Sequence, residues 1–137
     1  MAFEGLKKEI TSVPILAHVD MQKLFIIEAD ASDFSFGSIL SQQGDSEKLH
    51  LVAFHSRKFD AAEINYEIHD KDLFAIVDSF AQWRDFLEGS PHQVIVFSDH
   101  KNLAYFQNAS VLNRRQARWA QILTHFDFKI TYRPGKQ

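Results

Sequence analysis

The chain has 137 residues, of which 45% are hydrophobic and 24% charged, and this composition is typical of one globular domain with a buried core. Cysteine is absent, which excludes disulfides, thiolate metal sites and cysteine nucleophiles. The first ten residues are amphipathic rather than apolar, so they do not resemble a signal peptide, and no apolar segment has the length of a membrane span. We therefore expect an intracellular protein with no membrane partner.

Charge is distributed unevenly along the chain. The formal net charge is −3, but residues 111–137 contain six basic residues and one acidic residue, whereas the rest of the chain contains nine basic and 17 acidic residues. A basic C-terminal region suits contact with phosphates, and an acidic body suits the binding of cations. A solvated helix face combined with chance explains the same pattern equally well.

The first half of the sequence predicts a short helix followed by three strands. Residues 3–12 have an amphipathic pattern that ends before Pro14. The three strands that follow are joined by short links with good turn residues, which predicts an antiparallel meander. These strands cover residues 23–30, 34–42 and 49–59.

The second half predicts helices that alternate with two further strands. Asp60 and Glu63 fit a capping box, which opens a helical stretch that is interrupted near Asn65 and continues to about Leu87. The later elements are a strand at 93–99, helices at 100–108 and 110–126, and a strand at 127–133. The order β-β-β-α-β-α-α-β predicts an α/β fold with a mixed five-stranded sheet and helices on its faces. Within that sheet, the first and fourth strands should be parallel neighbours.

Three aspartates lie where an isolated carboxylate is unfavourable. Asp30 and Asp99 end apolar strands, and parallel neighbouring strands would bring both to the carboxyl edge of the sheet, where open α/β folds keep their sites. Asp72 is predicted to be the only charged residue on the helix face that packs against the sheet. Carboxylates on rigid elements suit Mg²⁺ or Mn²⁺, and a pair of such ions hydrolyses phosphodiesters.

Each aspartate also has a simpler explanation. Asp30 lies in an Asp-Ala-Ser-Asp segment, which is good turn chemistry, and Asp99 can cap the helix that begins at His100. Asp72 can form a salt bridge with Arg57 or Lys58. The coincidence of all three aspartates favours the metal-site hypothesis.

Six blocks in unbroken order carry a family resemblance across residues 5–136. They read "EADASDFSFGSILSQ", "VAFHSRKF", "AEINYEIHDKDLFAIV", "WRDFLEG", "VFSDHKNL" and "NRRQARWAQILTHFDFKITYRPGK". The chain resembles the ribonuclease H domain of reverse transcriptases from LTR retrotransposons of the Ty3/gypsy group. The resemblance implies a ribonuclease H fold, hydrolysis of the RNA strand of an RNA–DNA hybrid, and two Mg²⁺ or Mn²⁺ ions held by four acids.

The same resemblance implies a polyprotein context. A polymerase domain would precede this one, so that residues 1–20 form a connector and residues 21–137 the ribonuclease H-like domain. The expected location is the cytoplasm, a virus-like particle or the nucleus.

The resemblance assigns roles to individual acids. Asp30 takes the place of the acid in the usual "TDAS", and Asp99 that of the acid in "TDH". Asp72 occupies a position where the family normally has Glu, so its carboxylate reaches less far toward the ions. The fourth acid normally lies on a helix beyond "YRPGK", and the chain ends at Gln137. We therefore expect the fold to lack its C-terminal helix and to bind metal more weakly than an intact domain.

Candidate contacts with nucleic acid lie in the "NRRQARW" segment. A hybrid is recognised through backbone phosphates and 2′-hydroxyls, and Arg114, Arg115 and Arg118 are the predicted phosphate contacts, with a solvated helix face as the alternative. His100 is a possible auxiliary residue near the ions or simply part of a first helical turn. His55 and His69 are expected to be structural, and Trp83 and Trp119 to lie in the core.

Two other functions remain open. The shortened acid at Asp72 and the end at Gln137 are compatible with a catalytically weakened or inactive ribonuclease H-fold remnant that has a structural or interaction role. A different nuclease or phosphotransferase with the same broad fold is the third possibility.

Overall fold

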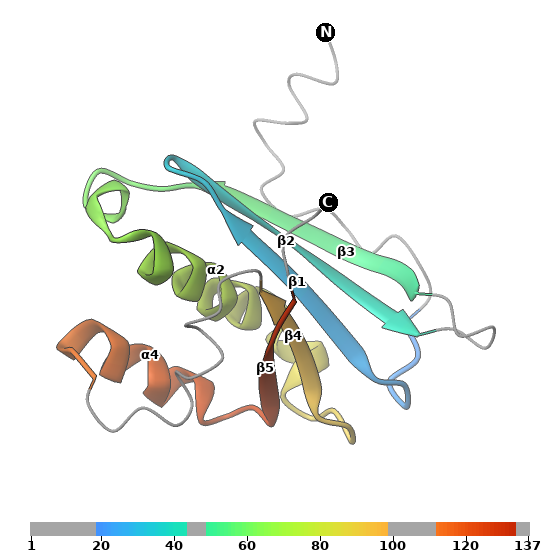
Figure 1. The fold of residues 1–137 in the computed structure, drawn as a ribbon. Helices are drawn as coiled ribbons and strands as arrows, with labels where there is room; N and C mark the ends of the chain where they lie inside the picture. The colour runs from blue at the N-terminus through green and yellow to red at the C-terminus, as the bar shows by residue number, and fades with distance from the viewer. Residues whose placement is uncertain (1–18, 44–48, 99–111, 134–137) are drawn as a thin grey trace, which may run out of the picture.

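The computed structural model describes residues 19–43, 49–98 and 112–133, and within them five strands form one mixed sheet in the order β3-β2-β1-β4-β5 (Figure 1). The strands are β1 (Phe25–Ala31), β2 (Ser35–Gln43), β3 (Leu49–Lys58), β4 (Val94–Ser98) and β5 (Phe128–Tyr132). The helices are η1 (Glu63–Asn65), α2 (Ile68–Gln82), α3 (Arg84–Leu87) and α4 (Arg114–Leu123). The predicted helices at 3–12 and 100–108 lie outside the described residues.

The pairing of the strands confirms the predicted meander and its parallel neighbour. β1 pairs antiparallel with β2, and β2 pairs antiparallel with β3, whereas β4 lies parallel to both β1 and β5. A tight turn is enough to join the antiparallel strands β1 and β2. Within it the backbone N–H of Ser32 donates to the carbonyl of Ser35 at 2.8 Å. Parallel strands need a longer crossover, which η1, α2 and α3 supply between β3 and β4.

The two faces of the sheet differ in what covers them. Alternation along β1 directs Phe25, Ile27 and Ala29 into the core beneath α2, and Glu28 and Asp30 to the opposite face. We call the α2 side the inner face and the opposite side the outer face. α2 and α4 lie on the same side of the sheet in Figure 1. The carboxyl ends of β1, β4 and β5 point toward the same edge.

The helices differ from the prediction at their ends. The long helix breaks at Trp83, whose φ of −108° and ψ of 26° leave the helical range, so that α3 is a separate turn. Trp83 is buried, as predicted, and its ring lies 6.2 Å from that of His55. α4 starts at Arg114 because Asn113 and Gln116 form a reciprocal capping box. No helix of the described ranges is long and apolar enough to cross a bilayer.

The prediction that Asp72 is the only charged residue of the long helix that faces inward is wrong in part. Asp72 is 3% exposed, but Asp70 and Lys71 are buried to the same degree, at 4% and 5%. The prediction included the sheet as the only packing partner of this helix. In the folded chain α4 covers a second side of α2, and the Arg115 and Gln116 side chains both donate hydrogen bonds to the Asp70 carboxylate.

Candidate active site

Asp30 is the second-last residue of β1. Its side chain is exposed on the outer face, and its cross-strand partner on β2 is Gly37. A Cβ atom placed on Gly37 would meet nothing within 4 Å. Open space therefore lies beside Asp30, and a larger residue at position 37 would fill part of it.

A buried lysine ties α2 to the turn that follows Asp30. The Nζ of Lys71 donates a hydrogen bond of 2.7 Å to the backbone carbonyl of Asp33 and lies 5.4 Å from the centre of the Phe59 ring. The Ser32 hydroxyl bonds within the same turn to the carbonyl of Ser35, at 3.1 Å. The N-terminal part of α2 is thus anchored at the carboxyl end of β1.

Asp72 lies at that end of α2 on its sheet-facing side. Two helical turns further along, Ser79 is hydrogen-bonded to Ser38 of β2, and Ser38 pairs with Ala29 of β1. Seven residues of helix span about 10.5 Å, so Asp72 is displaced by that distance from Ser79 toward the turn after Asp30. Asp72 therefore approaches the edge of the sheet from the inner face, whereas Asp30 projects from the outer face.

The third predicted acid cannot be compared with these two. β4 ends at Ser98, and both Asp99 and His100 lie outside the described residues. Among the residues that the structure describes, no group of three or more His, Asp or Glu side chains could hold a metal ion. Asp30 and Asp72 nevertheless fit such an ion in donor chemistry, because both offer the hard carboxylate oxygens that Mg²⁺ and Mn²⁺ prefer. The three-acid site stays a prediction.

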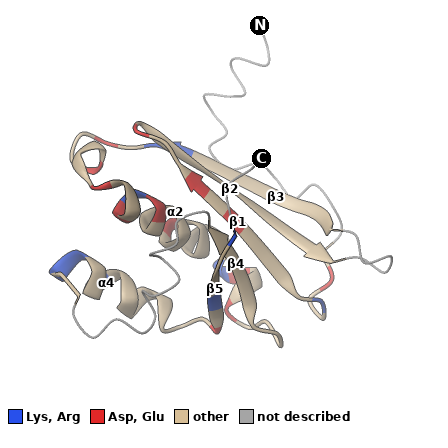
Figure 2. Cartoon of the chain, viewed as in Figure 1, with Lys and Arg blue, Asp and Glu red and all other residues tan. Residues whose placement is uncertain are grey.

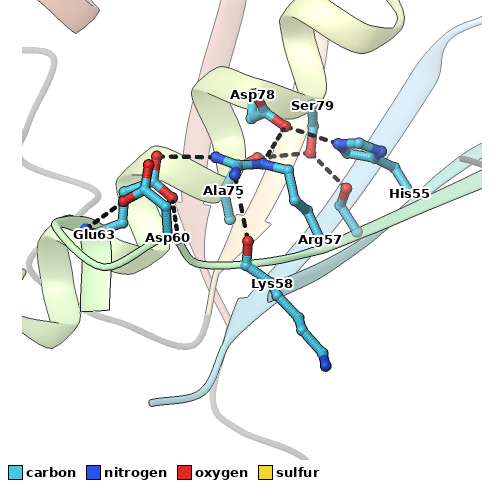
Figure 3. Close-up of polar contacts among 9 residues, drawn as sticks. His55, Arg57, Lys58, Asp60, Glu63, Ala75, Asp78 and Ser79 are labelled. Carbon is cyan, nitrogen blue, oxygen red and sulfur yellow. Dashed lines mark hydrogen bonds and ion pairs between the residues drawn. The ribbon is translucent and has the colours of Figure 1, made fainter. Parts of the chain in front are cut away.

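His55 has a structural setting, as its sequence context predicts. The buried ring shares a 2.8 Å hydrogen bond between Nε2 and the Asp78 carboxylate of α2 (Figure 3). Arg57 lies 3.7 Å from the same carboxylate through Nε and donates to Glu63 at 3.1 Å. Glu63 also exchanges hydrogen bonds with Asp60 in both directions. This cluster fastens β3 to α2 and η1.

The three arginines of α4 differ in their surroundings. Arg114 and Arg118 are exposed and one helical turn apart. Arg115 instead lies 3.1 Å from the Asp70 carboxylate and 3.8 Å above the Tyr66 ring. Arg115 thus joins α4 to α2, whereas Arg114 and Arg118 face solvent. Figure 2 shows basic residues at the N-terminal end of α4.

We expect Arg115→Ala to lower the free energy of unfolding by about 1–2 kcal/mol, because Asp70 loses a charge-assisted hydrogen bond and Tyr66 a stacked cation. The side chain of Arg115 is 40% exposed, which keeps the loss below that of a fully buried pair. Urea unfolding followed by tryptophan fluorescence measures it. Arg118→Ala, on the same helix and exposed, should change stability by less than about 0.5 kcal/mol, and equal losses would contradict the assignment.

One charged pair on the outer face was not predicted. Arg133, which follows β5, forms an ion pair with Glu28 of β1, and its guanidinium carbon lies 4.5 Å above the Phe97 ring of β4. Strand alternation from Asp30 would have placed Glu28 on the outer face. Nothing in the sequence signals that a residue 105 positions away bonds to it.

A mixed sheet in this order, with a crossover helix that carries a buried acid and exposed acids at a strand end, defines a ribonuclease H-like α/β domain. The family described as "RNase H-like domain found in reverse transcriptase" matches residues 20–126. The chain belongs to this family, and the resemblance to Ty3/gypsy-type reverse transcriptases is confirmed. The Tf2-3 transposon polyprotein of Schizosaccharomyces pombe is 38% identical over 136 residues, which are 98% of this chain and 10% of that polyprotein.

Solved structures agree on the fold. The foamy viral protease-reverse transcriptase in complex with RNA/DNA hybrid aligns with a TM-score of 0.64 at 15% identity, over 89% of this chain and 17% of that one. RNase H1 from the halophilic archaeon Halobacterium salinarum aligns with a TM-score of 0.56 at 15% identity, over 81% of this chain and 86% of that one. The predicted fold class is therefore confirmed.

Proposed function

We propose that this domain is a metal-dependent endoribonuclease that hydrolyses the RNA strand of RNA–DNA hybrids. The observation that carries the proposal is the approach of two acids to one edge of the sheet. Asp30 lies beside open space at Gly37, and Asp72 lies on the helix that Lys71 anchors to the turn after Asp30. Membership of the reverse transcriptase family supports the choice of substrate.

Asp30, Asp72 and Asp99 are the proposed ligands of Mg²⁺ or Mn²⁺. When bound, two such ions would supply an activated water and would stabilise the departing oxygen. The chain's own contribution is to hold the carboxylates in place: Lys71 and the Ser32–Ser35 bonds restrain the turn after Asp30, and burial restricts the rotamers of Asp72. His100 is proposed as an auxiliary residue near the ions.

Arg114 and Arg118 are the proposed phosphate contacts on α4, and Arg115 orients the helix that carries them. Phosphate contacts carry no sequence information, so cleavage should depend on the hybrid form and little on base sequence. Because the chain spans 10% of the length of the curated relatives that it matches, we propose that a polymerase domain of the same polyprotein is its partner.

The test is cleavage of an end-labelled RNA–DNA hybrid in Mg²⁺ and in Mn²⁺, by this chain and by the chain extended through the helix that the family resemblance implies. RNA–RNA and DNA–DNA duplexes of the same sequence are the controls. Cleavage of the hybrid alone supports the proposal. A folded, extended protein that cuts no hybrid in either metal would leave the inactive remnant as the better description.

The short side chain of Asp72 leads us to expect different cleavage rates in Mg²⁺ and in Mn²⁺. Its carboxylate is one methylene shorter than the Glu usual in the resembled family, and Mg²⁺ demands stricter octahedral geometry than larger ions. We expect several-fold faster cleavage in Mn²⁺ than in Mg²⁺, and we expect Asp72→Glu to reduce that ratio. Single-turnover rates of both proteins in both metals measure it. An unchanged ratio would show that the length of this side chain is not limiting.

A further inference from the structure

The outer face of the sheet holds an arginine that is paired with Glu28, the neighbour of Asp30 on this face of β1. Glu28 and Asp30 are two residues apart on β1 and share this face, so their Cα atoms are about 6.7 Å apart. Arg133 pairs with Glu28 from β5, across β4. The register Glu28↔Phe97↔Thr131 places these three side chains on the outer face. Arg133 lies two residues after Thr131 and therefore shares that face.

Arg133 is held at both its backbone and its side chain. Its backbone N–H donates to the carbonyl of Ser98 at 2.8 Å, which continues the ladder between β4 and β5. The guanidinium stacks on Phe97 and bonds to Glu28, yet the side chain remains 49% exposed. Because the guanidinium is already fixed and is still half exposed, it loses little further conformational entropy when it binds a second anion.

A second basic side chain lies on the outer face of β5. Lys129 pairs in register with Ile95 of β4, on the same outer face, and is exposed. Lys129 and Arg133 are four residues apart, or about 13 Å along the strand. β5 is the edge strand on this side of the sheet, and Figure 2 shows basic residues on β5 and acidic residues at the arrowhead end of β1. The register places Lys129 level with Ile26, so it lies farther from Asp30 than Arg133 does.

We propose that Arg133 binds a backbone phosphate of the nucleic acid on the outer face near Asp30, that Lys129 contacts a second phosphate farther from Asp30, and that Glu28 positions the guanidinium for its contact. The inference rests on the proposed function, because Asp30 marks the place where a strand would be cut. A guanidinium presents five N–H donors in a planar fork, so that one edge can meet Glu28 and another a phosphate. Glu28 then limits affinity, because its charge repels the phosphate that Arg133 attracts.

The experiment measures binding rather than cleavage. The chain carrying Asp30→Asn is titrated with a fluorescent RNA–DNA hybrid without divalent metal, at several salt concentrations. We expect Arg133→Ala to weaken binding about three- to tenfold and to reduce the slope of log K against log salt by about one. Arg133→Lys should retain part of the affinity, and Lys129→Ala should cause a smaller loss. Glu28→Gln keeps an oxygen that accepts from the Arg133 guanidinium but removes the negative charge, so it should tighten binding.

The structure offers a matched control in the Arg84–Glu88 pair of α3, which joins the same residue types at 2.8 Å. The hydrogen bond from Arg84 holds the pKa of Glu88 below its usual value. Arg84→Ala and Glu88→Gln change the net charge by the same amounts as the outer-face variants. They should leave hybrid affinity and salt slope unchanged.

Opposite effects of Arg133→Ala and Glu28→Gln are the result that supports the inference. A purely structural ion pair would give equal losses of thermal stability and no change in salt slope. That outcome overturns it, as does an Arg84→Ala effect as large as that of Arg133→Ala. If the wild-type chain cuts hybrids while Arg133→Ala binds normally, only this inference fails. A wild-type chain that neither binds nor cuts hybrids overturns the proposed function as well.

Discussion

Asp30→Asn is expected to abolish cleavage of RNA–DNA hybrids while leaving the fold intact. The carboxylate projects from the end of β1 beside the open space at Gly37, and amide substitution removes its charge at constant size. Metal-derived stabilisation of a transition state amounts to several kcal/mol, and each 1.4 kcal/mol or so is a factor of ten in rate. We therefore expect a loss of at least about a thousandfold in single-turnover rate.

Asp33→Asn is the matched control for this experiment. Asp33 is exposed and lies three residues away, and Lys71 bonds to its backbone carbonyl rather than to its carboxylate. The same charge change at this position should leave the rate within about twofold and the free energy of unfolding within about 0.5 kcal/mol. Comparable losses of activity in both variants would point to general electrostatics and against a ligand role for Asp30.

We expect Asp78→Ala to lower the free energy of unfolding more than Arg115→Ala does. Its carboxylate bonds at 2.8 Å to the His55 ring, which is 3% exposed, and lies 3.7 Å from Arg57. Removing a charged partner of a buried group costs about 2–3 kcal/mol. Urea unfolding monitored by circular dichroism and by the buried Trp83 and Trp119 measures the loss.

Two further variants make the stability test specific. Asp78→Asn keeps an oxygen acceptor for His55 and should lose about half as much as Asp78→Ala. Asp85→Ala removes an exposed carboxylate from α3 and should cost less than about 0.5 kcal/mol. If Asp78→Ala and Asp85→Ala prove equally stable, the cluster around His55 does not fasten β3 to α2.

Local pattern predicted the elements well and their exact limits less well. The strands were recognisable because apolar and β-branched runs are short and bounded by turn residues, and the capping exchange between Asp60 and Glu63 forms as expected. The break at Trp83 was missed because the residue satisfies the apolar period of a continuous helix on both sides. The start of α4 was predicted too early because several polar residues before it could serve as its N-cap. In the structure Asn113 is the N-cap.

Periodicity and motif spacing can be read along the chain, and they were enough to predict the mixed sheet, the parallel neighbours β1 and β4, the burial of Asp72 and the family. The burial of Asp70 and Lys71, the link that Arg115 makes between two helices and the contact of Arg133 with Glu28 became visible in the folded chain alone. Each of these depends on how a second element packs against the first. A hydrophobic period records that a face is covered, but it does not record which distant side chain covers it.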